Sequence, residues 1–160
     1  YHFLMKRGRE RGFTLIEALI VLAIGFVIAT VVFVSVSVSS GRQALKSAVS
    51  LTLATFAHAR SMSLASHGDS EYGVYLATST LTIFKGMIYS SSDPNNQLVY
   101  LSDRASITST SLIGGGQSVV FDRLTGATSQ SGTLRITISS DPQASSTITI
   151  YETGIVESSS

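Results

Sequence analysis

Apolar side chains dominate residues 13–34, where Glu17 is the only charged residue. As a helix that rises 1.5 Å per residue, this run would measure about 33 Å, against about 30 Å for the hydrocarbon core of a bilayer. The pattern therefore predicts a helix at residues 13–34 that is long enough to span a membrane.

The helical pattern continues over residues 35–66, because no proline occurs between Phe13 and Asp93. Apolar residues recur at helical spacing along one side of this segment, at Leu45, Val49, Leu53, Phe56 and Leu64. This spacing predicts that one side of the helix packs against a sheet. The weakest part is residues 35–41, where Val and Ser alternate before a glycine, so an extended or locally melted segment is an alternative there.

After residue 67 the pattern changes to the two-residue alternation of β-strands. The predicted strands are residues 72–77, 81–85, 97–101, 118–121, 133–139 and 147–152. Glycine, proline and asparagine predict turns at residues 91–96, 114–116, 124–126 and 141–142. A long helix followed by short antiparallel strands predicts an α+β fold, in which the helix packs on an antiparallel sheet or small β-sandwich. The predicted head covers residues 67–157, and no structure is predicted for the serine tail at 158–160.

Positive charge is concentrated before the apolar run. Lys6, Arg7, Arg9 and Arg11 lie there, and short basic flanks stay on the cytoplasmic side of a membrane, so we expect the head outside the cytoplasm. Of the 11 basic and 10 acidic residues in the chain, these four and Glu10 precede Phe13, which leaves seven basic and nine acidic residues in the rest. That balance does not indicate a nucleic-acid-binding surface. The absence of cysteine from the sequence excludes disulfides and thiolate metal sites.

Glu17 is the first candidate functional residue. A lone carboxylate at membrane depth costs at least a few kcal/mol, so it is expected to have a partner and a function. An acid in this position would have no purpose if the apolar run were a signal segment that is discarded.

Two cleavage positions are open. An ordinary secretory signal could be cut after the small residues at 35–37 or 37–39, which would leave a chain starting near Val38 or Ser40. The other possible cut is between Gly12 and Phe13, before the apolar run. It is favoured because the apolar run is longer than the core of a usual secretory signal. The predicted leader is residues 1–12, or eight residues if translation starts at Met5.

Residues 6–24 resemble the class III signal of type IV pilins and type II secretion pseudopilins. They combine a short basic leader, Gly12 followed by Phe13, Glu17 at the fifth position after the cut, and an unbroken apolar helix. The resemblance implies a prepilin peptidase that cuts after Gly12 and methylates Phe13, followed by assembly with other pilin subunits. The new α-amine has a reference pKa of about 8, and the Glu17 carboxylate of a neighbouring subunit could pair with it.

The head carries a looser resemblance. Residues 53–65 are similar to the late helix of the GspH/FimT-like minor pilins and pseudopilins, and residues 120–126, 133–138 and 148–156 resemble the closing strands of that branch. This implies a minor subunit of a pilus or pseudopilus, anchored in the inner or cytoplasmic membrane of a bacterium by residues 13–34. A major pilin or a DNA-uptake minor pilin are alternatives, and so is a monomeric secreted or surface-anchored β domain with ordinary signal cleavage.

No enzyme motif, cofactor site or metal site is predicted from the sequence. It has neither a G-x-S-x-G nor an H-E-x-x-H pattern. Asp93, Asn95 and Gln97 alternate like the start of a calcium loop, but the later glycine and glutamate are missing, so we interpret them as part of a plain turn. His58 and His67 are interpreted as helix-surface or capping residues.

Four arginines could contact DNA if they lay on one face of the molecule, namely Arg60, Arg104, Arg123 and Arg135. Scattered surface charges are the preferred interpretation, so nucleic acid is not predicted as a partner. The sequence does not distinguish secretion from motility, adhesion or DNA uptake, because those outcomes depend on motors and partner subunits.

Overall fold

The computed structural model describes residues 13–159, and of residues 31–39 it describes the backbone alone. The chain divides into two compact units, Tyr1–Val38 and Ser39–Ser160. One helix, α1 (Leu15–Leu64), belongs to both units and is followed by the short 3-10 helix η1 (His67–Asp69). The predicted helix is therefore confirmed, and residues 35–41 are helical rather than extended. Two residues after the end of α1, Ser66 adopts a left-handed conformation with φ of 50°, which stops the helix.

The buried side of α1 is formed mostly by small residues. Its buried positions are Gly41, Ala44, Ala48, Thr52, Thr55, Phe56, Ala59 and Ser63. Thr52 and Thr55 donate their hydroxyl hydrogens to the carbonyls of Ala48 and Leu51, each over 2.8 Å, so these polar groups are satisfied within the helix.

The prediction of the packed side of α1 was therefore correct in part. Phe56 is buried, Leu45, Val49 and Leu53 are half-buried at the margins, and Leu64 is exposed. The reason is that small side chains allow the helix backbone to approach the sheets closely, which leaves the larger side chains at the flanks.

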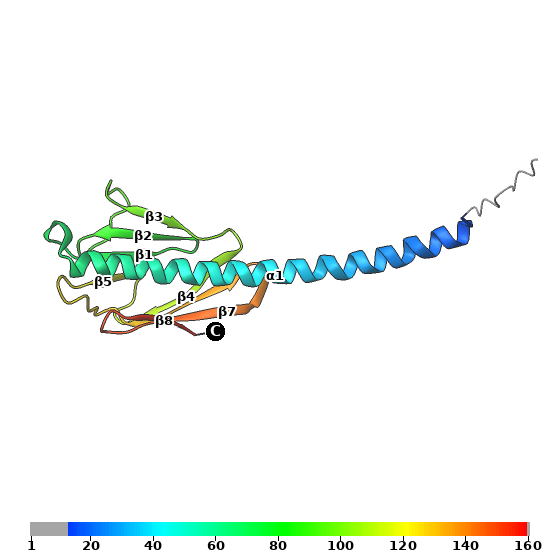
Figure 1. The fold of residues 1–160 in the computed structure, drawn as a ribbon. Coiled ribbons are helices and arrows are strands. Elements are labelled where there is room, and N and C mark those ends of the chain that lie inside the picture. The colour runs from blue at the N-terminus through cyan, green and yellow to red at the C-terminus, as the bar shows by residue number, and fades with distance from the viewer. Residues whose placement is uncertain (1–12, 160) are drawn as a thin grey trace, which may run out of the picture. The chain divides into compact units, whose positions relative to one another are not determined.

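The described residues after η1 form two antiparallel four-stranded sheets (Figure 1). The first has the order β3-β2-β1-β5, with strands β1 (Tyr72–Leu76), β2 (Thr80–Lys85), β3 (Gln97–Tyr100) and β5 (Ser118–Phe121). The second has the order β4-β6-β7-β8, with strands β4 (Ala105–Leu112), β6 (Gly132–Ile138), β7 (Asp141–Ile150) and β8 (Val156–Ser159). This confirms the predicted α+β fold with a small β-sandwich head.

Two strands were missed, and one turn was misplaced. β4 was missed because a register shift between Ile107 and Ser109 breaks its apolar alternation, so its buried residues Ala105, Ile107 and Leu112 are unevenly spaced. β8 was missed because it is an edge strand with one apolar residue, Val156, and it extends into the serine tail, for which no structure was predicted.

Residues 141–142 were predicted as a turn, yet they begin β7. The pairing of β6 with β7 shifts register beside them, and a proline that cannot donate a ladder hydrogen bond is tolerated at such an irregularity. The turn falls two residues earlier, at residues 139–140.

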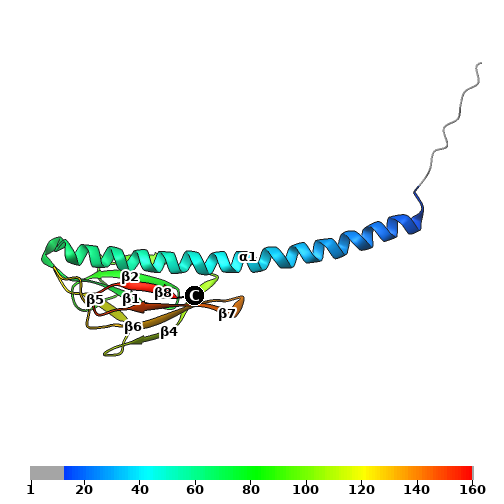
Figure 2. The ribbon, with the colours of Figure 1, turned by 60° about the horizontal axis from the view of Figure 1, so that its bottom comes forward.

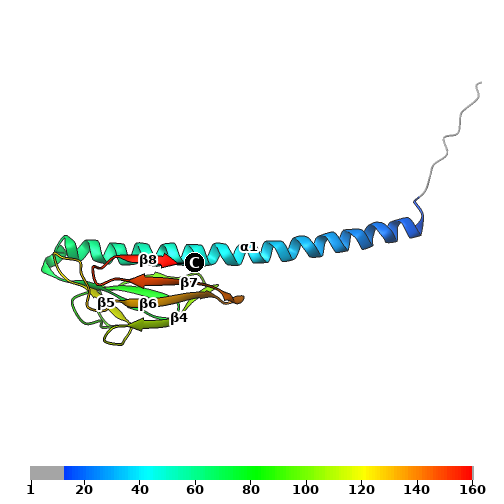
Figure 3. The same cartoon turned by 90° about the horizontal axis from the view of Figure 1, so that it is seen from below.

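A single core joins α1 to both sheets. Phe56 of α1 meets Phe121 of β5 edge to face, with ring centroids 6.3 Å apart, and the core continues through Val74 of β1 to Ile136 of β6 and Ile148 of β7. Figure 2 shows the strands of the head gathered under the part of α1 that belongs to Ser39–Ser160, and Figure 3 shows β8 running beside that helix.

We expect Phe56→Ala to lower the free energy of unfolding of the head by about 3–5 kcal/mol, because the fully buried ring leaves a cavity between α1 and β5. Leu51→Ala on the same helix is the matched control, because Leu51 is 37% exposed and should cost less than about 1 kcal/mol. Urea unfolding of the two detergent-solubilised variants, followed by tyrosine fluorescence, would measure both. Equal losses would show that Phe56 does not anchor the core.

Candidate functional site

Thr14 caps the first turn of α1. Its Oγ1 accepts a hydrogen bond from the backbone N–H of Glu17 over 3.3 Å, and its carbonyl accepts one from the N–H of Ala18 over 3.1 Å. Thr14 and Glu17 have the spacing of a capping box, S/T-x-x-E, which the sequence analysis missed although this signature was present. Glu17 thus lies in the first turn of α1, where a carboxylate interacts favourably with the positive end of the helix dipole.

The described side chains of residues 13–30 are all exposed. Phe13 is 77% exposed, and large apolar residues of α1 such as Leu22 and Phe26 are 74% and 77% exposed. A helix that is apolar on every side needs an apolar environment around it. As far as its side chains are described, the structure contains no helix that is long and apolar enough to cross a membrane.

The other predicted processing residues lie outside the described residues. These are Gly12 and the basic leader residues Lys6, Arg7, Arg9 and Arg11. Phe13 and Glu17 are described and are both exposed. The roles assigned to all of these residues remain predictions.

Arg60 links α1 to two turns of the head through side-chain hydrogen bonds. Its Nε donates a hydrogen bond to the carbonyl of Gly126 over 3.0 Å, and its Nη2 donates one to the carbonyl of Thr153 over 3.1 Å. Gly126 follows β5, and Thr153 lies in the turn between β7 and β8. The guanidinium therefore holds together segments that are 66 and 93 residues away along the chain.

Gly154 makes this arrangement possible. Its φ is 75°, and a Cβ atom there would collide with the carbonyl oxygen of Gly126 and lie 2.8 Å from Nε of Arg60. A side chain at this position would therefore separate the two turns that Arg60 connects. The sequence analysis missed this cluster, because nothing in the local pattern links residues so far apart.

Two of the four arginines considered for DNA contact are engaged within the chain. Arg60 makes the contacts above, and Arg123 pairs with Asp69 over 3.1 Å and donates to Ser66 Oγ over 3.2 Å. Arg104 and Arg135 are exposed, Arg104 in the β3–β4 connection and Arg135 in the middle of β6. Arg60 and Arg123, which lie near the C-terminal end of α1, therefore have structural roles within the head.

The remaining candidates have local structural explanations. Asp93 accepts hydrogen bonds from the backbone N–H and the side-chain amide of Asn95, over 2.8 and 2.9 Å, and these bonds lower the pKa of its carboxyl group. This is the predicted turn, closed by an Asx hydrogen bond. His58 is exposed on α1, and the ring of His67 lies 6.0 Å from that of Tyr72. Within residues 13–159, no group of three or more His, Cys, Asp or Glu is placed to hold a metal ion.

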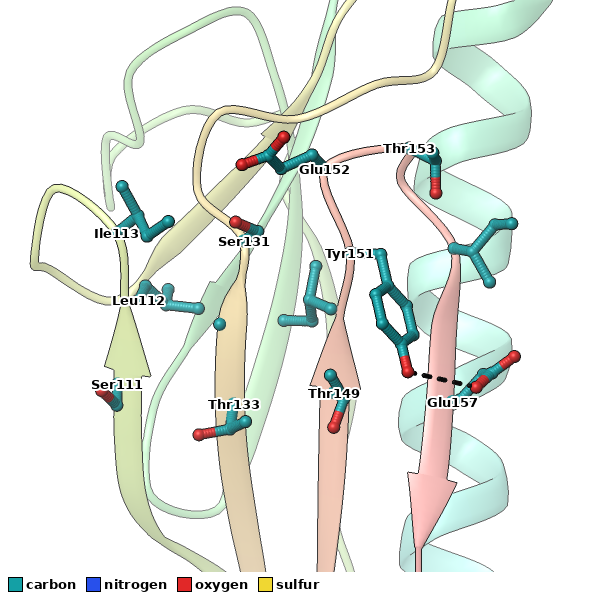
Figure 4. Close-up of a pocket in the computed structure, with 13 residues that line it drawn as sticks. Ser111, Leu112, Ile113, Ser131, Thr133, Thr149, Tyr151, Glu152, Thr153 and Glu157 are labelled. Atoms are coloured by element: carbon teal, nitrogen blue, oxygen red, sulfur yellow. Dashed lines mark hydrogen bonds between the residues drawn. The ribbon is translucent and has the colours of Figure 1, made fainter.

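A surface hollow of about 980 Å³ lies at one end of the second sheet (Figure 4). Its polar side chains come from neighbouring strands, among them Ser111, Thr133 and Thr149, and its apolar lining includes Ile113 and Ile155. Tyr151 Oη donates a hydrogen bond to Glu157 Oε2 over 3.4 Å, and Figure 4 shows Glu152 pointing away from this pair. The sequence analysis did not predict this hollow.

A capped apolar helix that leads into a head of two antiparallel sheets is the architecture that the pilin resemblance implies. Residues 7–33 match the family model of the prokaryotic N-terminal methylation motif. The predicted prepilin-type signal is therefore confirmed, and the fold is that of a pilin.

Two crystal structures of the type IV minor pilin FimU from Pseudomonas aeruginosa PAO1, in different space groups, share this fold. One is 13% identical, with a TM-score of 0.52 over 72% of this chain and 93% of FimU. The other is 14% identical, with a TM-score of 0.55 over 74% of this chain and 90% of FimU. No curated protein matches the sequence. At these identities the likeness concerns the fold alone.

We expect Arg60→Met to lower the free energy of unfolding of the head by about 1.5–3 kcal/mol, because it removes charge-assisted hydrogen bonds to two carbonyls. Arg123→Met is the matched control and should cost less than about 1 kcal/mol, since Asp69, its ion-pair partner, is 93% exposed. Thermal unfolding of the two variants compares them. A larger loss for Arg123→Met would contradict the role given to Arg60.

Proposed function

We propose that this protein is a minor pilin or pseudopilin, a structural subunit that is processed after Gly12 and assembled into a filament through α1. The observation that carries the proposal is the methylation motif at residues 7–33, together with the helical residues 15–30, whose side chains are exposed and almost all apolar. Both the motif and the fold are those of structural proteins, which supports a function other than catalysis.

The exposed apolar surface of α1 needs to be covered in each state of the protein. Before assembly, lipid would cover residues 13–34, with the basic leader in the cytoplasm and the head on the other side of the membrane. After assembly, the same helices of neighbouring subunits would cover it. The membrane-spanning role of residues 13–34 is argued from the sequence, because the structure describes residues 31–34 by their backbone alone.

Glu17 would direct assembly. Cleavage after Gly12 creates a cationic α-amine on Phe13, and the carboxylate of Glu17 in an adjoining subunit could pair with it inside the bundle of helices. The first turn of α1 supports this role, because Thr14 accepts hydrogen bonds from the backbone N–H groups of Glu17 and Ala18, and the carboxylate of Glu17 stays exposed.

A minor subunit is favoured over a major pilin because the compared structures are of a minor pilin and the head predictions point to the same branch. Ordinary signal cleavage at residues 35–39 is not favoured, because α1 is helical through these residues. The seven basic and nine acidic residues from Phe13 onward argue against a general DNA-binding surface.

We expect Gly12→Leu to block processing, because a peptidase cleft that accepts glycine has no space for a branched side chain. The mass of the intact protein from membranes measures this result. The unchanged chain should begin at Phe13 with one added methyl group, and the variant should keep its leader. A start near Val38 or Ser40 would instead support the secreted β domain.

We expect Glu17→Ala to be inserted and processed normally but to be absent from filaments, because the α-amine of its neighbour loses its partner. Thr30→Val is the control: it removes a hydroxyl that bonds within the same helix, to the carbonyl of Phe26, and should assemble normally. Immunoblots of sheared filaments and of membranes separate assembly from insertion. Normal assembly of Glu17→Ala would refute the pairing.

A further inference from the structure

The hollow at the end of the second sheet lies on the outer face of that sheet. Strand pairing places side chains from all four strands opposite one another in a single row, formed by Ser111, Thr133, Thr149 and Glu157. Leu134 and Ile148, which neighbour two of these residues in the chain, are buried in the core. Successive residues of a strand point to opposite faces of a sheet, so the row faces solvent.

A second row lies beside the first, where the strands end. The N–H of Ile113 donates a hydrogen bond to the carbonyl of Ser131 over 2.8 Å, and the N–H of Tyr151 donates one to the carbonyl of Ile155 over 2.9 Å. These four residues also line the hollow. Small hydroxyl side chains therefore form the floor of the hollow, and bulkier side chains border it.

Tyr151 and Glu157 form the border beside β8. Tyr151 is 45% exposed, and its hydrogen bond to Glu157 holds the ring between β7 and β8 (Figure 4). An ionised carboxylate has about four acceptor positions, so Glu157 can still accept hydrogen bonds from a ligand. Glu152 points away from this pair, so Glu157 is the carboxylate beside the ring.

The lining fits an uncharged ligand that is rich in hydroxyl groups. Serine and threonine hydroxyls both donate and accept hydrogen bonds, and a carboxylate accepts strong ones. The lining residues that the structure describes include no lysine, arginine or histidine, so an anion would meet only the negative charge of the glutamates. A sugar ring carries hydroxyl groups on its edge and C–H groups on its faces, and these faces pack against aromatic rings.

The size and the apolar border of the hollow narrow the class of sugar. A volume of about 980 Å³ lies at the upper end of the range of about 300–1,000 Å³ for ligand sites, which leaves room for more than one ring. Ile113 and Ile155 are 60% and 48% exposed at the border. A plain hydroxyl group would gain nothing from these side chains, whereas the methyl group of an acetamido substituent would cover apolar surface.

We propose that this hollow binds an oligosaccharide of N-acetylated amino sugars. One ring packs on Tyr151, its hydroxyl groups bond to Thr133, Thr149 and Glu157, and acetamido methyl groups contact the isoleucines. The inference goes beyond the proposed function, because such binding requires neither processing nor assembly. Glycan strands of the bacterial cell wall and chitin both present this chemistry.

Isothermal titration calorimetry of the processed full-length chain with tri-N-acetylchitotriose tests the proposal. The detergent has to be free of sugar, and lauryldimethylamine oxide meets this condition. We expect saturable binding with a dissociation constant below about 1 mM. Cellotriose has the same backbone without acetamido groups, so it should bind about fourfold more weakly, which is the effect of burying one methyl group.

Variants locate the site. Tyr151→Ala should weaken binding about tenfold, because the ring that packs on the sugar is lost. Tyr100→Ala is the matched control, because Tyr100 is 69% exposed on β3 of the first sheet and should leave binding unchanged. Ile113→Ser combined with Ile155→Ser should remove the preference for tri-N-acetylchitotriose over cellotriose. Thermal unfolding checks that each variant keeps its fold.

The proposal is overturned if tri-N-acetylchitotriose at millimolar concentration gives no saturable binding, or if Tyr151→Ala binds it as well as Tyr100→Ala does. Tighter binding of the peptide Gly-Lys-Gly would assign the hollow to basic side chains and would also overturn it. Sedimentation with purified cell-wall sacculi and with chitin distinguishes the two sources, and binding to either supports the shared chemistry. A chain that binds the sugar but never enters filaments would refute the proposed function alone.

Discussion

The close approach of α1 to both sheets is the constraint on which the head depends. It is possible because the buried stripe of the helix consists of alanine, threonine, serine and glycine, with Phe56 as the one large side chain that is fully buried among those of α1 that the structure describes. Threonine hydroxyls in the stripe bond to the helix itself, so their burial leaves no polar group unsatisfied. The same helix has a different composition before residue 31, where almost every exposed side chain is apolar. One continuous element therefore supplies a core to the head and an uncovered apolar surface to its surroundings.

Much of this organisation could be predicted from sequence, because its signals are local. The apolar run, the alternation in β1, β2 and β5, and the turn at Asp93 all follow from residues close together in the chain. β4 and β8 could not be found in this way, since a register shift breaks the pattern in the first and hydroxyl residues dominate the second. The small buried residues of α1 were overlooked because hydrophobic periodicity gives most weight to leucine and valine, which lie at the margins of the contact.

The candidate functional features also differ in whether local sequence reveals them. The N-terminal signal could be recognised because Gly12, Phe13 and Glu17 are contiguous with the basic leader, and the match to the methylation motif confirms the signal. Arg60 and the hollow around Tyr151 depend on contacts between residues tens of positions apart, which a single sequence does not reveal. The two FimU structures share this fold at only 13–14% identity, so the fold leaves most of the sequence free to vary. Both Arg60 and the hollow contact turns of the head.

The connection between β4 and β5 illustrates this division. Gly114, Gly115 and Gly116 all have positive φ, and a Cβ atom at any of them would meet nothing within 4 Å. Ile113, which forms part of the wall of the hollow, directly precedes them. Loops of this kind accept changes of length at little cost, because no packed neighbour has to move. Insertions and deletions here would alter the surface beside the hollow while both sheets stay intact, so this part of the head can change independently of the fold.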